Sequence, residues 1–363
     1  MMGARVLMAM SGGVDSSVAA ALLLEQGYEV IGVTMQLWSE ALPYGVEVEG
    51  GCCSLGAVED ARAVAGKLGI PYYVLNFHDQ FQKQVIDYFA NEYLAGRTPN
   101  PCIVCNNLLK FGGLLDKARA LGADYVATGH YARTGPDPES GRYLLMKGQD
   151  SSKDQSYVLY GLTQEQLART LFPLGNFTKP AIRQKAADLG LKVATKPDSQ
   201  EICFVPDQDY SRFIAEYRPG EMRPGKIRDT DGTVLGEHSG VANFTIGQRK
   251  GLGIASGTPL YVTAIRPETN EVVVGTAEEV MADGLFATGL NWIAIPYLKG
   301  PLPAEVKIRY SARPVPALLE PDNSGRVAVR FERSQRAITP GQAAVFYNGD
   351  QVIGGGTIEE SFS

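Results

Sequence analysis

Short apolar runs alternate with longer helical patterns through the first 200 residues of this 363-residue chain. The apolar runs predict buried strands at residues 5–10, 29–34, 71–75 and 124–128. The stretches between them predict helices at residues 16–26, 57–68, 80–94 and 108–120, each of which ends near a glycine. Because strands that alternate with helices form parallel sheets, we predict an α/β fold with a doubly wound parallel sheet, whose ligands bind at the carboxyl ends of its strands.

The composition changes after about residue 206, where glycine and proline recur and short alternating runs replace helical patterns. Strands are predicted at residues 259–265, 271–274, 305–310, 325–331 and 343–347, as in a small barrel or sandwich. An inserted hairpin is predicted at residues 133–147, and a helix at 178–189 with Thr178 as its N-cap. We predict three domains: 1–205, a central β-rich domain at 206–276, and a C-terminal β-barrel at 277–363.

The longest uninterrupted aliphatic stretch, residues 18–24, is far shorter than the span of about 20 residues that a membrane helix needs. The first residues also lack the pattern of a secretory signal, so we expect a cytoplasmic protein with no membrane partner. The five cysteines are an odd number, which disfavours a structural disulfide framework.

The formal net charge of −6 is unevenly distributed along the chain. Residues 1–100 hold 11 acidic and 5 basic side chains, whereas residues 301–340 hold seven basic and four acidic ones. Since a nucleic-acid surface needs local rather than overall positive charge, a polyanionic partner remains compatible with this acidic chain.

The loop between the first predicted strand and helix reads Ala-Met-Ser-Gly-Gly-Val-Asp-Ser-Ser, residues 9–17. Glycines, hydroxyls and a helix N-terminus together form a cradle for phosphate, although the alternative is a plain strand-to-helix turn. The loop lacks the lysine of a Walker motif and does not fit G-x-G-x-x-G. Asp15 would repel phosphate unless a divalent cation bridged them, so it suggests Mg²⁺ with a nucleotide.

Ser-Gly-Gly-Val-Asp-Ser resembles the signature of the ATP pyrophosphatase, or PP-loop, superfamily, whose fold is adenine nucleotide alpha hydrolase-like. The resemblance implies that ATP is bound by ten residues: Ala9, Met10, Ser11, Gly12, Gly13, Val14, Asp15, Ser16, Met35 and Gly129. Of these, Met35 and Gly129 would line the adenosine pocket.

Cys102 and Cys105 form a C-x-x-C pair in a proline-rich loop that is predicted to lie just before a helix. A thiol near a helix N-terminus has a stabilised thiolate, which suits a nucleophile. Cys203 lies near the predicted domain boundary, in Lys-Pro-Asp-Ser-Gln-Glu-Ile-Cys-Phe. The histidines show no paired spacing, which disfavours zinc, and the adjacent Cys52 and Cys53 are interpreted as loop or half-buried thiols.

Several motifs in order along the whole chain resemble the bacterial tRNA-specific 2-thiouridylases (MnmA family). They include Thr-Pro-Asn-Pro with Cys-Asn, Ala-Thr-Gly-His-Tyr-Ala-Arg, Lys-Asp-Gln-Ser-Tyr and Phe-Thr-Ile-Gly-Gln-Arg-Lys-Gly-Leu-Gly. The resemblance implies an ATP-dependent tRNA-uridine 2-sulfurtransferase that adenylates the C2 oxygen of the wobble uridine. Cys203 would carry a persulfide from a cysteine desulfurase or a sulfur-relay protein. Cys105 would be the nucleophile, and 2-thiouridine, AMP, pyrophosphate and a transient Cys105–Cys203 disulfide would result.

The same resemblance implies contacts to the tRNA substrate. Asn100, Pro101 and Cys102 would contact the target base, whereas His130, Lys153, Asp154, Gln155, Arg309, Tyr310 and Gln342 would contact the rest of the tRNA. Arg309 offers a phosphate partner and Tyr310 a stacking face. An alternative role for His130 is to cap the fourth strand.

The chain departs from the family pattern at Cys102, where many members have aspartate, which puts any carboxylate role there in doubt. Three thiols, Cys102, Cys105 and Cys203, permit an alternative route in which they hold a 4Fe–4S cluster. A different PP-loop enzyme with a carbonyl-adenylate intermediate, and a non-enzymatic RNA-binding module, are further alternatives.

Overall fold

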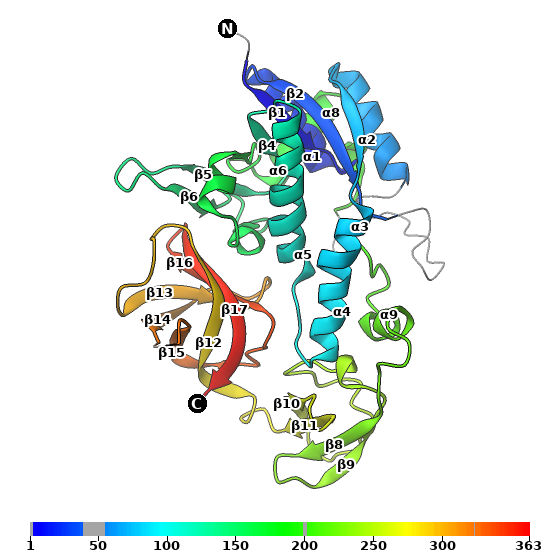
Figure 1. Cartoon of the computed structure of the whole chain (residues 1–363), viewed down its shortest axis with the longest axis vertical. Helices are drawn as coiled ribbons and strands as arrows, with labels where there is room; N and C mark the ends of the chain where they lie inside the picture. The colour runs from blue at the N-terminus through cyan, green and yellow to red at the C-terminus, as the bar shows by residue number, and fades with distance from the viewer. Residues whose placement is uncertain (1–2, 39–54, 199–201, 323) are drawn as a thin grey trace. The chain divides into compact units, whose positions relative to one another are not determined.

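The computed structural model describes residues 3–38, 55–198, 202–322 and 324–363, which form two compact units (Figure 1). The first unit comprises Met1–Val85, Cys102–Gln208 and Asp350–Val352. The second comprises Ile86–Pro101, Asp209–Gly349 and Ile353–Ser363. Cys52 and Cys53 lie outside the described residues.

The first unit is built on a five-stranded parallel sheet with the order β3-β2-β1-β4-β7. Its strands are β1 (Arg5–Ala9), β2 (Glu29–Gln36), β3 (Tyr72–Asn76), β4 (Tyr125–Ala127) and β7 (Thr170–Leu171). Val6 of the central strand pairs with Val30 of β2 on one side and with Tyr125 of β4 on the other. The strand order therefore reverses between β1 and β4, which is where ligands of such sheets bind.

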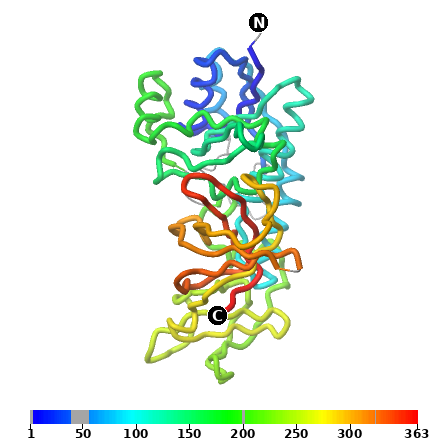
Figure 2. The backbone as a smooth tube through the Cα atoms, turned by 90° about the vertical axis from the view of Figure 1, so that its left-hand side faces the viewer, coloured from blue at the N-terminus to red at the C-terminus, as the bar shows by residue number. Residues whose placement is uncertain are grey.

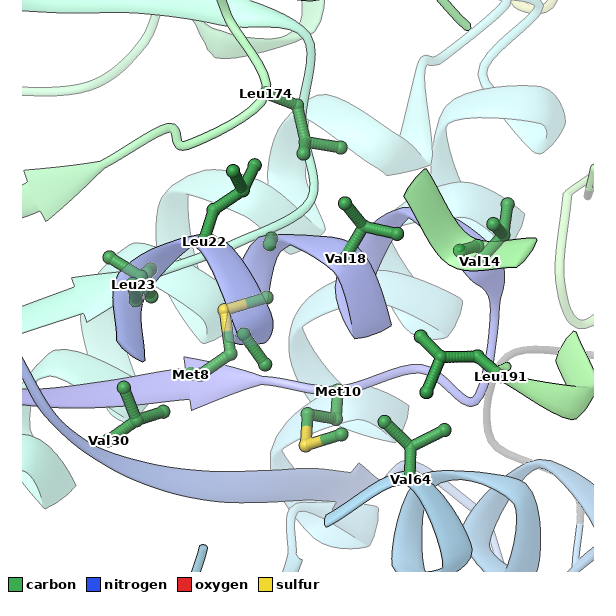
Figure 3. Close-up of a cluster of buried hydrophobic side chains, with 14 of the residues drawn as sticks. Met8, Met10, Val14, Val18, Leu22, Leu23, Val30, Val64, Leu174 and Leu191 are labelled. Carbon is green, nitrogen blue, oxygen red and sulfur yellow. The ribbon is translucent and has the colours of Figure 1, made fainter. Parts of the chain in front are cut away.

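Helices cover the sheet, and alternate residues of β1 bury opposite faces. Val6 and Met8 pack into a core with α1, α2 and α8, part of which Figure 3 shows, whereas buried Leu7 belongs to the other face. The helical elements of this unit include α1 (Val14–Glu25), α2 (Leu55–Leu68), α3 (His78–Phe81), α6 (Leu114–Ala120), η3 (Ser156–Leu159), α7 (Gln164–Ala168), α8 (Lys179–Asp188) and η4 (Lys192–Thr195). The π-helical turn η1 (Gln82–Ile86) follows α3 in sequence, and the next helix, α4 (Asp87–Leu94), belongs to the second unit.

The helix predicted at residues 108–120 begins earlier, at Pro101, and the prediction of a loop around the cysteines is wrong. α5 (Pro101–Val104), the π-helical segment η2 (Cys105–Gly113) and α6 follow one another without a break. Proline is well tolerated as the first residue of a helix because its missing N–H would have no partner there. Cys102 and Cys105 are thus the second and fifth residues of this helical run.

The inserted hairpin is present as β5 (Ala132–Pro136) and β6 (Tyr143–Lys147), which pair antiparallel. Gln351 pairs with Met146 of β6. Thr178 is the N-cap of α8, as its sequence predicts.

The second unit contains a four-stranded sheet with the order β10-β11-β8-β9. Its strands are β8 (Gly225–Asp229), β9 (Val234–His238), β10 (Tyr261–Arg266) and β11 (Glu271–Gly275), accompanied by α9 (Tyr210–Tyr217) and η5 (Val241–Asn243). Ile227, Val262, Val272 and Val274 form its core. This is the predicted central β-rich domain.

Six further strands follow, with the order β12-β15-β14-β13-β16-β17, and a β12–β17 pairing closes them into a barrel (Figure 2). They are β12 (Met281–Trp292), β13 (Leu302–Lys307), β14 (Val315–Pro321), β15 (Val327–Arg336), β16 (Ala343–Asn348) and β17 (Gln351–Phe362). The predicted fold class, a doubly wound parallel sheet followed by a central β-rich domain and a C-terminal β-barrel, is confirmed.

Candidate functional site

The loop after β1 lies at the carboxyl edge of the sheet and leads into α1. Gly12 has φ +66°, and a Cβ there would lie 2.2 Å from the carbonyl oxygen of Ala57. Only glycine fits this position, because both the backbone conformation and the space exclude a side chain. Gly13 is the N-cap of α1, so the N–H groups of the first helical turn face the loop.

Serine hydroxyls form hydrogen bonds within the loop. The Ser11 N–H donates to Ser16 Oγ over 3.1 Å, and Ser17 Oγ donates to the Gly13 carbonyl over 2.8 Å. The loop is therefore held in a compact shape by its own side chains, with its backbone donors at the helix start.

Met35 lies on, and Gly129 just after, a strand that neighbours β1. Gly129 follows β4, and a Cβ there would lie 2.8 Å from the backbone nitrogen of Ser16. Met35 is a buried residue of β2, the strand that neighbours β1 on its other side. The fold thus gathers the predicted ATP residues at the carboxyl edge of the sheet, around the point where the strand order reverses.

The negative charge of Asp15 is balanced by residues that were not among the predicted site residues. Both of its carboxylate oxygens lie 2.8 Å from Lys179 Nζ, and Oδ1 also accepts a hydrogen bond from Tyr131 Oη over 2.7 Å. Burial, followed by the Asp15 charge and hydrogen bond, raises the pKa of Tyr131, so its hydroxyl stays protonated. Asp15 is a single carboxylate, which fits the way Mg²⁺ is bound when substrate phosphates supply its other ligands.

A second carboxylate, Asp198, joins the same network. It lies 2.7 Å from Lys179, 2.8 Å from Lys153 and 3.0 Å from Arg183. Burial opposes its ionisation, but hydrogen bonds and charges from Lys153 and Lys179 outweigh burial and lower the pKa of Asp198 to about 2. Lys196, two residues earlier, pairs with Asp60 over 2.8 Å and donates to the Gly12 carbonyl over 3.2 Å.

Cys105 is buried at the start of η2, whereas Cys102 is exposed three residues earlier. The neighbouring Asn106 is also buried: it donates to the Val158 carbonyl and accepts from Lys110, both over 3.0 Å. π-helical turns recur at functional sites because they displace the side chains they carry. Here such a turn begins at the predicted nucleophile.

Cys203 is half-buried and precedes Phe204, whose ring packs against that of Phe81 in α3 at a centroid distance of 5.7 Å. Phe77, just before α3, lies against Gly113 of η2. The two segments that carry Cys105 and Cys203 therefore pack on the same stretch, Phe77 to Phe81. Among the described side chains, no three of His, Cys, Asp or Glu are gathered as metal ligands.

The segment that leads to Asn100 and Pro101 is held within the second unit. Gln342 Nε2 donates to the Thr98 carbonyl over 2.8 Å, and the Thr98 N–H donates to the Pro340 carbonyl over 2.9 Å. Gln342 thus acts on the backbone just before the predicted base-contacting residues.

The predicted tRNA residues of the first unit have structural partners. Asp154 accepts hydrogen bonds from the N–H groups of Gly148 and Ser156, and Gln155 Oε1 accepts from the Tyr131 N–H. His130 Nδ1 lies 2.7 Å from the Thr128 hydroxyl. Desolvation, followed by the Lys110 charge, holds the pKa of His130 well below its ordinary value, so His130 is neutral near pH 7 and offers no cation to phosphate.

In the barrel, the Arg309 guanidinium donates to the backbone carbonyls of Arg336 and Ala337. Tyr310 is 45% exposed, with Lys307 Nζ 5.4 Å from the centre of its ring. Two other cations of the basic stretch, Arg326 and Arg330, are ion-paired with nearby carboxylates. Tyr310 therefore presents an accessible aromatic face beside a cation.

Three family models match consecutive parts of the chain. They are described as a tRNA methyl transferase HUP domain (residues 4–207), a tRNA methyl transferase PRC-barrel domain (211–276) and an aminomethyltransferase beta-barrel domain (282–358). A tRNA-specific 2-thiouridylase MnmA of Heliobacterium modesticaldum is 61% identical over 97% of this chain and 92% of its own length. Proteins of the same name from Clostridium perfringens and Acetivibrio thermocellus are each 58% identical over 98% of this chain, and 98% and 99% of theirs.

The chain belongs to the tRNA-specific 2-thiouridylase family. This membership confirms the predicted family and the prediction that the chain is an enzyme of the tRNA sulfurtransferase class. A solved 4-thiouridine synthetase–RNA complex with bound ATP aligns with 56% of this chain and 46% of its own chain, at 21% sequence identity. The TM-score of this alignment, 0.35, is too low to add to the family assignment. No helix among the described parts of the chain is both long and apolar enough to span a membrane.

Sequence reasoning missed Lys179, Arg183 and Tyr131, because the residues of the network are scattered from position 15 to position 198. One local feature of the sequence could have pointed to Lys179. Lys179 is the first residue of α8, where the helix dipole disfavours a positive charge, so a lysine there needs a nearby anion.

Proposed function

We propose that this 2-thiouridylase family member converts the wobble uridine of tRNA to 2-thiouridine, using ATP and sulfur carried as a persulfide on Cys203. The observation that carries the proposal is the loop at residues 9–17, which Gly12 and Gly129 let pack closely against neighbouring backbone and which leads into the N-terminus of α1. Full-length similarity to proteins named for this reaction supports the choice of substrate.

The first step is adenylation. The C2 oxygen of uridine attacks the α-phosphorus of ATP, pyrophosphate leaves, and C2 now carries AMP as a leaving group. The loop donors stabilise charge on the phosphates. Asp15 would hold Mg²⁺, which would neutralise more of this phosphate charge when bound. Met35 and Gly129 would flank the adenosine.

The second step moves sulfur. The Cys105 thiolate attacks Sγ of the Cys203 persulfide, a Cys105–Cys203 disulfide forms, and hydrosulfide is released. Hydrosulfide attacks C2 and displaces AMP, leaving a thiocarbonyl. A thiol reductant then reduces the disulfide, and a cysteine desulfurase or relay protein reloads Cys203. The burial of Cys105 supports this role because it keeps water from the reacting sulfur.

The remaining predicted residues would contact the tRNA. Asn100, Pro101 and Cys102 would face the flipped base, as enzymes that modify one nucleotide require. Gln342 would act by holding the Thr98 backbone, and Tyr310 by stacking. Lys153, Asp154, Gln155 and His130 would shape a neighbouring contact surface. We assign catalysis to residues 1–205, tRNA contact to the barrel at 277–363, and a connecting role to residues 206–276.

The test is reconstitution with unmodified tRNA, ATP, cysteine and a cysteine desulfurase, followed by mass spectrometry of the tRNA nucleosides. We expect 2-thiouridine with the wild type, and tRNA-dependent AMP formation without thiolation with Cys105→Ser and with Cys203→Ser. Thiolation that both variants retain contradicts the proposal. Mass spectrometry also distinguishes sulfur exchange from the methyl transfer that two of the family-model descriptions mention.

The cluster route is an alternative supported by the presence of a third thiol, Cys102. A 4Fe–4S cluster needs all three cysteines, whereas the persulfide route needs only Cys105 and Cys203. An anaerobic preparation that contains no iron but is fully active, together with an active Cys102→Ser variant, would favour the persulfide route. Iron-dependent activity that is lost in Cys102→Ser would favour the cluster.

A further inference from the structure

Lys179 is a buried cation shared by two carboxylates. Its side chain is only 8% exposed, and its ammonium lies within 2.8 Å of both Asp15 and Asp198. Asp15 belongs to the phosphate loop and to the first turn of α1, whereas Asp198 lies in the segment that follows η4. Lys179 therefore joins the loop to the segment five residues before Cys203.

The surroundings of Lys179 are rich in charge. Among the described residues, four cations and four carboxylates interact around the loop: Lys153, Lys179, Arg183 and Lys196 with Asp15, Asp60, Asp150 and Asp198. The cations thus have carboxylate partners in this structure, and they lie next to helix N–H groups that also favour an anion. This group of charged side chains suits a ligand with several negative charges, which could replace one carboxylate as the partner of these cations.

We propose that Lys179 binds the β- and γ-phosphates of ATP, and that Asp198 occupies this cation until the nucleotide arrives. The inference rests on the proposed function in taking ATP as the nucleotide of this loop. On binding, phosphate oxygens replace the Asp198 carboxylate at Lys179. Asp198 keeps its pairs with Lys153 and Arg183, and the departing pyrophosphate returns Lys179 to Asp198.

This arrangement predicts opposite effects for the two partners of one ion pair. Removing the Lys179 charge deletes a phosphate ligand and weakens polyphosphate binding. Removing the Asp198 charge deletes the competitor and strengthens polyphosphate binding. An ion pair with a purely structural role would instead lose binding in both variants, because breaking a buried pair from either side is destabilising.

Isothermal titration calorimetry with a non-hydrolysable ATP analogue, with pyrophosphate and with AMP separates these cases. We expect Lys179→Met to lose at least about tenfold in affinity for the analogue and for pyrophosphate, with AMP affinity unchanged. Asp198→Asn should bind pyrophosphate more tightly than the wild type. Lys185→Met is the matched control, since Lys185 lies on the same helix and pairs with Glu25 over 2.9 Å; its affinities should not change.

Unchanged pyrophosphate affinity in Lys179→Met overturns the inference, as does weaker binding in both Lys179→Met and Asp198→Asn. Lys179→Met leaves two carboxylates without their shared cation, so Lys179→Arg serves as a second variant that retains the charge. Lys179→Arg should keep pyrophosphate binding within a few fold, and a loss equal to that of Lys179→Met contradicts the assignment. A wild type that binds ATP but does not thiolate tRNA would refute the proposed function and leave this inference standing.

Discussion

At the scale of single residues, Gly12 shows how closely the nucleotide loop is specified. Its positive φ and the Ala57 carbonyl both exclude a side chain. We predict that Gly12→Ala abolishes ATP binding and lowers the free energy of unfolding by more than the roughly 1 kcal/mol of backbone strain alone. Gly27→Ala is the matched control, because Gly27 has φ +85° but nothing within 4 Å of its missing Cβ. Equal destabilisation in urea titrations, with ATP binding intact in both, would contradict this reading.

His238 is a residue-scale source of acid sensitivity in the central domain. Burial lowers its pKa relative to the unfolded chain, so the unfolded state binds more protons. Stability should therefore be highest above the ordinary histidine pKa of about 6.5 and fall as the pH drops below it. We predict that His238→Phe flattens this dependence in thermal unfolding followed from about pH 8 to 5. A dependence as steep as that of the wild type would show that His238 does not contribute.

At the scale of elements, the helical run that begins at Pro101 positions Cys105. Asn106 donates to the Val158 carbonyl and accepts from Lys110, so Asn106→Ala removes a buried hydrogen bond to that carbonyl and should cost about 1–3 kcal/mol. We expect thiolation to fall while ATP affinity stays unchanged. Leu108→Ala, at a 48% exposed position of the same segment, should alter neither. If Asn106→Ala lowers stability but leaves thiolation at the wild-type rate, the segment does not position Cys105.

The sequence predicted some elements far better than others, for physical reasons. The parallel strands β1 to β4 were each predicted to within two residues of their bounds. β1, β2 and β4 are largely buried, but the predicted burial of β3 is wrong, because β3 is an edge strand whose residues are half-buried or exposed. β17 was missed because Gly354 and Gly356 resemble a loop, although a Cβ at either would lie within 2.6 Å of a carbonyl of β12. The Asp15–Lys179–Asp198 network was missed because only the fold brings these residues together.

At the scale of the whole molecule, the acidic net charge does not describe the surface that tRNA would contact. The excess negative charge lies in the first hundred residues, and the basic excess of residues 301–340 belongs to the barrel. We predict that tRNA affinity falls steeply with salt, and that Arg309→Gln weakens it and reduces the salt slope by about 1. Arg330→Gln is the control, because Glu320 already neutralises Arg330 at 2.8 Å. An equal effect of both variants in binding titrations would argue against a specific role for Arg309.

A single-turnover reaction tests the central claim most directly. The wild type is loaded with persulfide, cleared of the donor and of iron, and mixed with ATP and unmodified tRNA. The account predicts one 2-thiouridine and one AMP for each Cys203 persulfide consumed, with one Cys105–Cys203 disulfide left behind, and no 2-thiouridine from Cys105→Ser. Formation of 2-thiouridine without consumption of the Cys203 persulfide, or at the same yield in Cys105→Ser, would contradict it.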